Sequence, residues 1–119
     1  MSDLENFIDS ALEKYFQILN TKPQQGEDDK LLNFYNDQSK LTYGTRKLGA
    51  KKIVEELRKT KKEFTLDTYS YGSVDKDHVV ITGQCIIGNT KTPFTIVLES
   101  QPGINGQTNI YITNQIINT

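Results

Sequence analysis

The sequence is poor in the residue types on which most metal and thiol chemistry depends. Among its 119 residues there are one cysteine, one histidine and no tryptophan. A single cysteine cannot form an internal disulfide, which is typical of proteins from a reducing compartment. One cysteine and one histidine cannot build a Cys/His zinc site either. We therefore expect no metal ion and no other cofactor.

Long apolar runs are also absent. No stretch approaches the roughly 20 apolar residues that a helix needs to cross a bilayer, so we expect no membrane partner. The acidic N-terminus lacks the apolar segment of a signal peptide. The chain is 35% hydrophobic and 24% charged, which is ordinary for a globular protein. These features predict one domain over residues 1–119, located in the nucleus and the cytoplasm.

The few groups suited to catalysis are isolated from one another. His78 stands near Asp75 and Asp77, so an acid–base pair could form there. It also begins a predicted strand, where successive side chains point to opposite faces, which favours a partly exposed residue at a strand end. Cys85 lies inside an apolar strand, which is typical of a small core residue and not of an activated thiolate. We therefore assign no catalytic residue and predict that the chain is not an enzyme.

The first half of the chain has the apolar spacing of helices. Between residues 4 and 19, apolar side chains recur at steps of three and four, which places them on one helix face. A short second helix is predicted around residues 31–35, where Asp28 or Asp29 can cap its start. A third helix is predicted at residues 50–59.

After residue 62 the apolar period changes to two, which predicts strands. The candidate strands cover residues 63–71, 78–87, 93–100 and 108–117, and a small earlier hairpin covers 41–43 and 46–48. Short connections favour antiparallel neighbours, and helices followed by a meander of strands define an α+β fold. Gly83 in the middle of a strand indicates a bulge or bend that curves the sheet.

Several predicted strands carry apolar residues on both faces. Val80 and Ile86 lie opposite the face that Ile81 and Cys85 define, and Val97 behaves in the same way in the next strand. This chain has no residues left to cover a second apolar face, which predicts a protein partner, identical or different. Scattered surface apolar residues that need no cover are the alternative. The predicted partner interface comprises Val80, Thr82, Ile86, Val97, Ile112, Asn114 and Ile116.

Residues 46–62 carry a local excess of positive charge. Eight bases stand there against Glu55 and Glu56. The bases are Arg46, Lys47, Lys51, Lys52, Arg58, Lys59, Lys61 and Lys62. Such a stretch can contact RNA or an acidic protein partner. The alternative is a solvated helix end, because cations are favoured in the last turn of a helix.

Four stretches together resemble the nuclear transport factor 2-like superfamily. Residues 15–19 (YFQIL) are similar to the aromatic pair late in the family's first helix, and residues 32–43 (LNFYNDQSKLTY) to the segment before its first strand. Residues 48–57 (LGAKKIVEEL) resemble the family's glycine-led third helix. Residues 80–84 (VITGQ) resemble the strand with its valine–any–glycine element. The similarity is closer in residues 12–58 than afterwards.

The resemblance implies three helices packed in a strongly bent, cone-like antiparallel sheet. It also implies that the open face of the sheet pairs with another domain of the same fold. Val80, Val97 and Ile116 fall on that pairing face, so the resemblance and the two-faced strands point to the same residues.

Departures from the family pattern narrow the implied function. Gly44 stands where the carrier of the small GTPase Ran has a glutamate, and residues 88–92 (GNTKT) contain none of that carrier's aspartates. The closing segment 114–118 (NQIIN) also departs from the family's pattern. Because carboxylates would engage a basic partner surface, these losses argue against Ran binding. A chain that keeps the fold but lacks these carboxylates is similar to the small heterodimeric partner of messenger-RNA export receptors.

The resemblance therefore predicts a heterodimerising adaptor in messenger-RNA export, found in the nucleus, the cytoplasm and at the nuclear pore. Such an adaptor helps its partner to form a surface for the phenylalanine–glycine repeats of nucleoporins and for ribonucleoprotein. One alternative is a homodimeric transport factor or scaffold of the same fold. Another is a small pocket enzyme, for which the candidate groups are His78, Asp67, Tyr43, Tyr69 and Tyr71.

Overall fold

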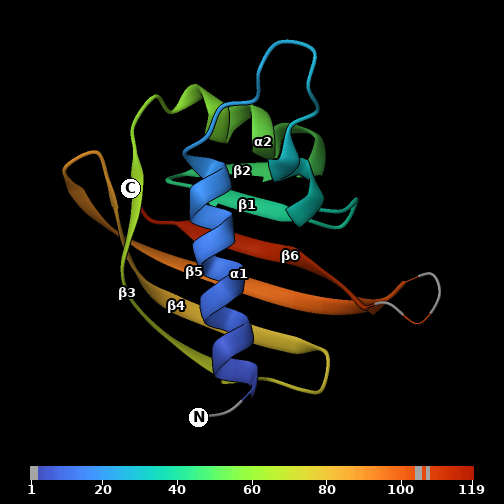
Figure 1. The fold of residues 1–119 in the computed structure, drawn as a ribbon. Coiled ribbons are helices and arrows are strands. Elements are labelled where there is room, and N and C mark those ends of the chain that lie inside the picture. Colours follow the sequence, from blue (N-terminus) through green and yellow to red (C-terminus); the bar gives the residue numbers. More distant parts are fainter. Residues whose placement is uncertain (1–2, 104–105, 107) are drawn as a thin grey trace.

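The computed structural model describes residues 3–103, 106 and 108–119. Its helices are α1 (Asp3–Leu19), the 3-10 helix η1 (Lys30–Phe34) and α2 (Ala50–Lys59). Its strands are β1 (Lys40–Tyr43), β2 (Arg46–Gly49), β3 (Phe64–Ser73), β4 (His78–Ile87), β5 (Thr90–Pro102) and β6 (Thr108–Ile117). Within the described residues these strands form one sheet in the order β2-β1-β6-β5-β4-β3 (Figure 1).

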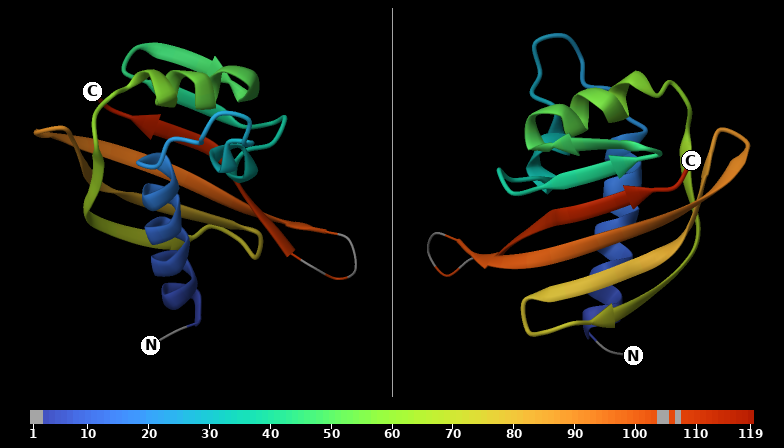
Figure 2. Two further views of the ribbon diagram at one scale, coloured as in Figure 1. Left: turned by 45° about the horizontal axis from the view of Figure 1, so that its top comes forward. Right: turned by 180° about the vertical axis from the view of Figure 1, so that it is seen from behind.

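The α+β class is confirmed, but the sheet is mixed and not purely antiparallel. The hairpin β1–β2 and the meander β3–β4–β5–β6 pair antiparallel, as predicted. In contrast, β1 runs parallel to β6, with Lys40 opposite Asn114 and Tyr43 opposite Ile117. The prediction considered only strands close in sequence, and it was wrong for this distant pair. The sheet is twisted but not strongly curled, so the strongly bent cone was also wrong (Figure 2).

Two of the three predicted helices are α-helices in the described chain, and the other is a short 3-10 helix. Before η1, the Asp29 carboxylate accepts a hydrogen bond from the backbone N–H of Leu31. The helix ends at Phe34 because Tyr35 is already extended, with φ −123° and ψ 154°, and its side chain is buried. Among the described residues, no helix combines the length and the apolar content that a membrane crossing requires.

α1 lies across one face of the sheet and supplies much of the core (Figure 1). Its buried residues are Ile8, Leu12, Tyr15, Phe16 and Leu19, which confirms the predicted apolar face. They belong to one cluster with Ile81, Ile96 and Ile117 from the sheet and with Ile53 and Leu57 from α2. Phe7 is the exception on this helix, because 42% of its surface remains exposed.

A closed ring of three hydrogen bonds joins α1, the end of η1 and β6. The Tyr35 hydroxyl donates to Oε1 of Gln115 at 2.7 Å, and Nε2 of Gln115 donates to the Tyr15 hydroxyl at 2.8 Å. The two tyrosine hydroxyls lie 2.7 Å apart. Because the Tyr35 proton is already used, Tyr15 must donate to Tyr35, so each group in the ring donates once and accepts once. Burial raises the pKa of both tyrosines, which keeps the ring protonated and neutral.

Replacing Tyr35 by Phe should destabilise the fold strongly. The change leaves the Tyr15 hydroxyl without an acceptor and Gln115 without a donor, and each unsatisfied buried group costs about 1–3 kcal/mol. We expect the free energy of unfolding, measured in urea, to fall by at least about 2 kcal/mol. The triple variant Tyr15→Phe, Tyr35→Phe, Gln115→Leu removes the whole ring and is the matched control. It should be less destabilised than Tyr35→Phe alone, and a triple variant that is the weaker of the two would contradict the ring.

Gly83 lies where β4 approaches a bulge in β3. The β3–β4 register shifts between Leu66 and Thr68, so Asp67 has no partner in β4. A Cβ atom on Gly83 would lie 2.0 Å from the carbonyl oxygen of Thr68 and 2.7 Å from the Cα of Tyr69. The predicted irregularity is therefore present, but the extra residue is in the neighbouring strand. Glycine is required because the bulge brings backbone into the space of a side chain.

Gly83→Ala should therefore destabilise the protein, whereas Gly72→Ala should not. A methyl group at Gly83 would displace backbone atoms of β3, and such overpacking costs about 1–3 kcal/mol or more. Gly72 is in the paired strand and has open space around it. Alanine there should change the free energy of unfolding by less than about 1 kcal/mol in either direction. Equal urea midpoints for the two variants would overturn the assignment.

Candidate interaction surface

The face of the sheet turned away from α1 is open over the long strands. In the right-hand view of Figure 2, no described helix lies over β3 to β6 on this side. Val80 and Val97 are direct cross-strand neighbours there, and Val97 is opposite Asn114 in β6. In the next row, Thr95 lies between Thr82 and Ile116. Five predicted interface residues are thus adjacent: Val80, Thr82, Val97, Asn114 and Ile116. We call these five the central patch.

In the central patch Val80 lies beside Val97 and Ile116 is diagonal to Val97, with polar side chains on both sides of this apolar row. Ile116 keeps 40% of its surface exposed, while Val80 and Val97 are half-buried. Ile86 points to the same side of β4 as Val80 but lies farther along the strand, beyond Gln84. The structure therefore groups Ile86 with the rim of the surface and not with its centre.

Ile112 is not on the open face, so its assignment to the interface was wrong. It is 2% exposed and lies in the core. In β6, Ile112 pairs with Leu98 and Asn114 pairs with Val97, which leaves Thr113 as an extra residue. This bulge reverses the alternation of sides after Ile112. Counting by two from Ile116 therefore gives the wrong face for Ile112.

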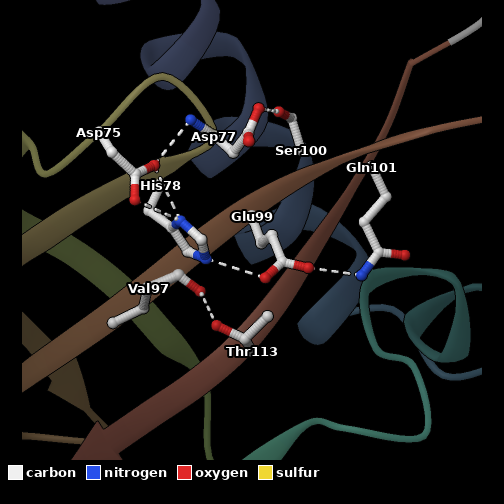
Figure 3. A network of polar contacts seen from close by, with 8 residues as sticks. All are labelled: Asp75, Asp77, His78, Val97, Glu99, Ser100, Gln101 and Thr113. Carbon is white, nitrogen blue, oxygen red and sulfur yellow. Dashed lines mark hydrogen bonds and ion pairs between the residues drawn. The ribbon is translucent and has the colours of Figure 1, made fainter.

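A polar network borders the central patch (Figure 3), and the sequence had suggested only its contact between His78 and Asp75. Nδ1 of His78 lies 2.9 Å from Oδ1 of Asp75, and Nε2 of His78 lies 2.8 Å from Oε1 of Glu99. His78 and Glu99 are cross-strand partners and point to the open side, as Val80 and Val97 do. Gln101 donates a hydrogen bond to the other Glu99 oxygen. Only the distant pairing of β4 with β5 brings His78 and Glu99 together, so no local motif reveals the pair.

This geometry favours the charged form of His78. Both ring nitrogens face carboxylate oxygens, so an imidazolium can donate to each of them. The hydrogen bonds to Asp75 and then to Glu99 raise the pKa of His78 above its ordinary value of 6.5. The pKa of Asp75 is lowered mainly by His78, and that of Glu99 by the Gln101 hydrogen bond and then by His78. When the imidazole is protonated, the network therefore places one cation between two anions.

The remaining catalytic candidates do not converge on one pocket. Tyr43 bonds to Oγ1 of Thr60 at 3.2 Å, and Asp67 is exposed at the β3 bulge. His78 is on the opposite side of the sheet from Tyr69 and Tyr71, as the strand register places them. Within the described residues, no group of three or more His, Cys, Asp or Glu side chains comes together to hold a metal ion.

Cys85 is buried on the helix side of β4, as predicted for a core residue. Burial raises the pKa of its thiol to about 11, so the thiol is protonated at neutral pH.

The basic stretch is divided between paired and unpaired side chains. Arg58 lies 2.7 Å from Oδ1 of Asp29 and donates to the carbonyl oxygens of Ile18 and Leu19, so it is held within the fold. Arg46 pairs with Glu56, and Lys59 pairs with the glutamates of α2. In the part of the chain that the structure describes, the other lysines form no ion pair. These are Lys47, Lys51, Lys52, Lys61 and Lys62, and they remain the candidates for contact with RNA or an acidic partner.

The protonation of His78 can be followed directly, because it is the only histidine of the chain. We expect its imidazole signal in a proton NMR titration to have a midpoint above 6.5. Glu99→Gln should lower that midpoint by removing one of the two carboxylates, and Asp75→Asn should lower it more. A midpoint at or below 6.5 in the unmodified chain would contradict the network.

The same network predicts how stability depends on pH. Because the pKa of His78 is raised, its contribution is complete below pH 6.5 and is lost as the pH rises through the raised value. Asp75 and Glu99 contribute fully to stability above their ordinary pKa values of 3.8 and 4.5. This contribution is lost as the pH falls through their lowered pKa values. The pH dependence above 6.5 in urea unfolding should be weaker in His78→Gln than in the unmodified chain.

Comparisons with known proteins find similar structures but no similar sequence. No family model and no curated protein matches the sequence. Among solved structures, a putative calcium/calmodulin-dependent protein kinase II association domain from Xanthomonas campestris aligns with a TM-score of 0.71 at 14% identity, over 94% of this chain and 84% of that one. Nuclear transport factor 2 from Cryptosporidium parvum aligns with a TM-score of 0.56 at 20% identity, over 92% and 89%.

ActVI-ORFA from Streptomyces coelicolor aligns with a TM-score of 0.65 at 11% identity, over 98% of this chain and 96% of that one. These proteins differ widely in name, and their identities to this chain are too low to carry more than architecture. The chain therefore has the nuclear transport factor 2-like fold.

Proposed function

We propose that this chain is a non-enzymatic protein-binding adaptor that pairs with another domain through the open face of its sheet. The observation that carries the proposal is the central patch. There, Val80, Val97 and Ile116 form an apolar centre on a face that no described helix covers over β3 to β6.

The arrangement of this face supports a protein partner. Protein interfaces have an apolar centre surrounded by polar groups that hydrogen-bond across the contact. Here the apolar centre is flanked by Thr82 and Asn114, and the His78–Glu99 pair borders it at one end. A stable interface buries about 1,200–2,000 Å² in total, which a face spanning several long strands can supply. Burying the exposed part of Ile116 would contribute to the free energy of association.

The narrower proposal is that the partner is the same-fold domain of a messenger-RNA export receptor. It rests on the sequence resemblance in residues 12–58 and on the missing carboxylates at Gly44 and in residues 88–92. In that role the pair would work in the nucleus and cytoplasm and at the nuclear pore. It would present a surface to nucleoporin phenylalanine–glycine repeats, and the unpaired lysines of the basic stretch would contact RNA or ribonucleoprotein. A homodimeric transport factor or scaffold is the alternative within the same geometry.

The pocket-enzyme alternative has no observation in its favour. It requires His78, Asp67 or the tyrosines to face one cavity, and they lie at separate places on two sides of the sheet. Tyr15 and Tyr35 are close to each other, but their hydroxyls are committed to the ring with Gln115.

Substitution of the central patch tests the adaptor proposal. Val97→Asp or Ile116→Asp places a charge in the apolar centre, and we expect association with the partner domain to weaken at least tenfold. The matched control is Leu32→Asp on η1, where an apolar side chain is 53% exposed away from the sheet face. Affinity is measured by calorimetry with the co-expressed export-receptor domain, and self-association by sedimentation over a concentration series.

The outcomes separate the alternatives. Self-association that Val97→Asp abolishes supports a homodimeric factor. A monomer that binds the receptor domain, and loses this binding in the same variant, supports the heterodimeric adaptor. If both substitutions leave every measured association as strong as Leu32→Asp does, the open face is not an interface.

A further inference from the structure

A second surface feature lies on the other side of the sheet, under the middle of α1. A pocket of about 270 Å³ opens between this helix and the strands β5 and β6. Its walls are almost entirely apolar and include Phe7, Ala11, Leu12, Phe34, Ile96 and Ile110. Phe7 lines this pocket while 42% of its surface is exposed, so the pocket leaves apolar area uncovered.

The pocket continues into a smaller depression that carries positive charge. This depression has a volume of about 240 Å³ and shares Lys14, Phe34 and Ile110 with the apolar pocket. It adds Lys30 and Asn33. The two spaces therefore meet at Lys14, Phe34 and Ile110, and Lys30 lines only the depression.

The two lysines are available to a ligand. Both are exposed, and neither forms an ion pair with a residue that the structure describes. Asp29 does not compete for these lysines, because it is held in an ion pair with Arg58. Glu27 and Asp28 line a larger hollow that also includes the lysines, but neither lines the depression beside Phe34.

We propose that this pocket binds a single-chain amphipathic anion, with its alkyl chain in the apolar chamber and its head group between Lys14 and Lys30. Dry apolar cavities of about 150 Å³ accommodate benzene, with six carbon atoms. By the same measure the chamber holds an alkyl chain of about ten carbon atoms. A medium-chain fatty acid fits this size and charge. The site is separate from the central patch, because it lies on the face of the sheet that α1 covers.

A chain-length series tests the chamber. Binding of hexanoate, octanoate, decanoate, dodecanoate and tetradecanoate to the intact chain is measured by calorimetry, below their micelle concentrations. Each added methylene should tighten the dissociation constant about fourfold until the chamber is full, at about ten carbons. The constant should then stop falling. A continued gain through tetradecanoate would indicate adsorption to exposed apolar surface, and no binding by decanoate at millimolar concentration would exclude the site; either overturns the proposal.

Head-group substitutions test the lysines. Decanoate should bind at least fivefold more tightly than 1-decanol at low salt, and added salt should reduce this ratio. The double variant Lys14→Gln, Lys30→Gln should weaken decanoate to the level of decanol and leave decanol unchanged. The double variant Lys76→Gln, Lys91→Gln removes the same charge at two lysines that line neither space, and it is the control. Equal loss in both double variants would mean that only net charge matters, which contradicts the proposal.

Filling the chamber gives an independent readout. Ala11→Leu keeps a good helix former on α1 and directs a larger side chain into the pocket. It should lower decanoate and decanol affinity at least tenfold while circular dichroism and the melting temperature stay close to those of the unmodified chain. A folded Ala11→Leu protein that binds decanoate as before would overturn the proposed site, and the lysine variants test it if this protein does not fold.

Discussion

The ring of Tyr15, Tyr35 and Gln115 is the interaction on which the arrangement of this molecule depends. It joins α1, the end of η1 and β6, which come from separate parts of the sequence, through three buried hydrogen bonds. Because every member donates once and accepts once, loss of any one member leaves its neighbours unsatisfied in the core. The ring therefore fixes which face of the sheet α1 covers, and so it also decides which face stays open.

A second contact secures the C-terminal end of α1. Arg58 donates to the carbonyl oxygens of Ile18 and Leu19 in the last turn, where a helix leaves its carbonyl groups without intrahelical α-helical partners. Its ion pair with Asp29 also ties this end to the segment before η1. Mutual hydrogen bonding lowers the pKa of Asp29 and raises that of Arg58, so both stay charged. Arg58 thus holds the C-terminal end of α1, while the ring holds Tyr15, which also lines the pocket between this helix and the sheet.

Sequence periodicity predicted the elements that depend on local spacing. The apolar stripe of α1, the helix α2 and the four long strands have positions close to those expected. The errors involve contacts between distant residues. The parallel pairing of β1 with β6 and the His78–Glu99 pair both depend on register, which no local pattern carries.

Two further differences have equally specific causes. Arg58 stands in a run of bases that is typical of a solvated helix end, but its partner Asp29 is 29 residues earlier in the chain. Ile112 and Ile116 are an even number of residues apart, so simple alternation would place them on the same face. The bulge at Thr113 puts them on opposite faces. The central patch could be predicted because its residues follow simple strand alternation, as Val80 and Thr82 do in β4. The polar border of that patch could not be predicted in this way.

The buried ring and the exposed Ile116 are linked by strand geometry. Gln115 must point inward to complete the ring, so its neighbour Ile116 must point outward. The bulge at Thr113 makes this compatible with Ile112 in the core. Alternation dictates the direction of the side chain at position 116 but not its chemistry. Thr42 and Thr95, beside Ile116 on the same face, show that polar strand-forming residues fit there. Under the proposed function, a partner that covers Ile116 accounts for the isoleucine at this position.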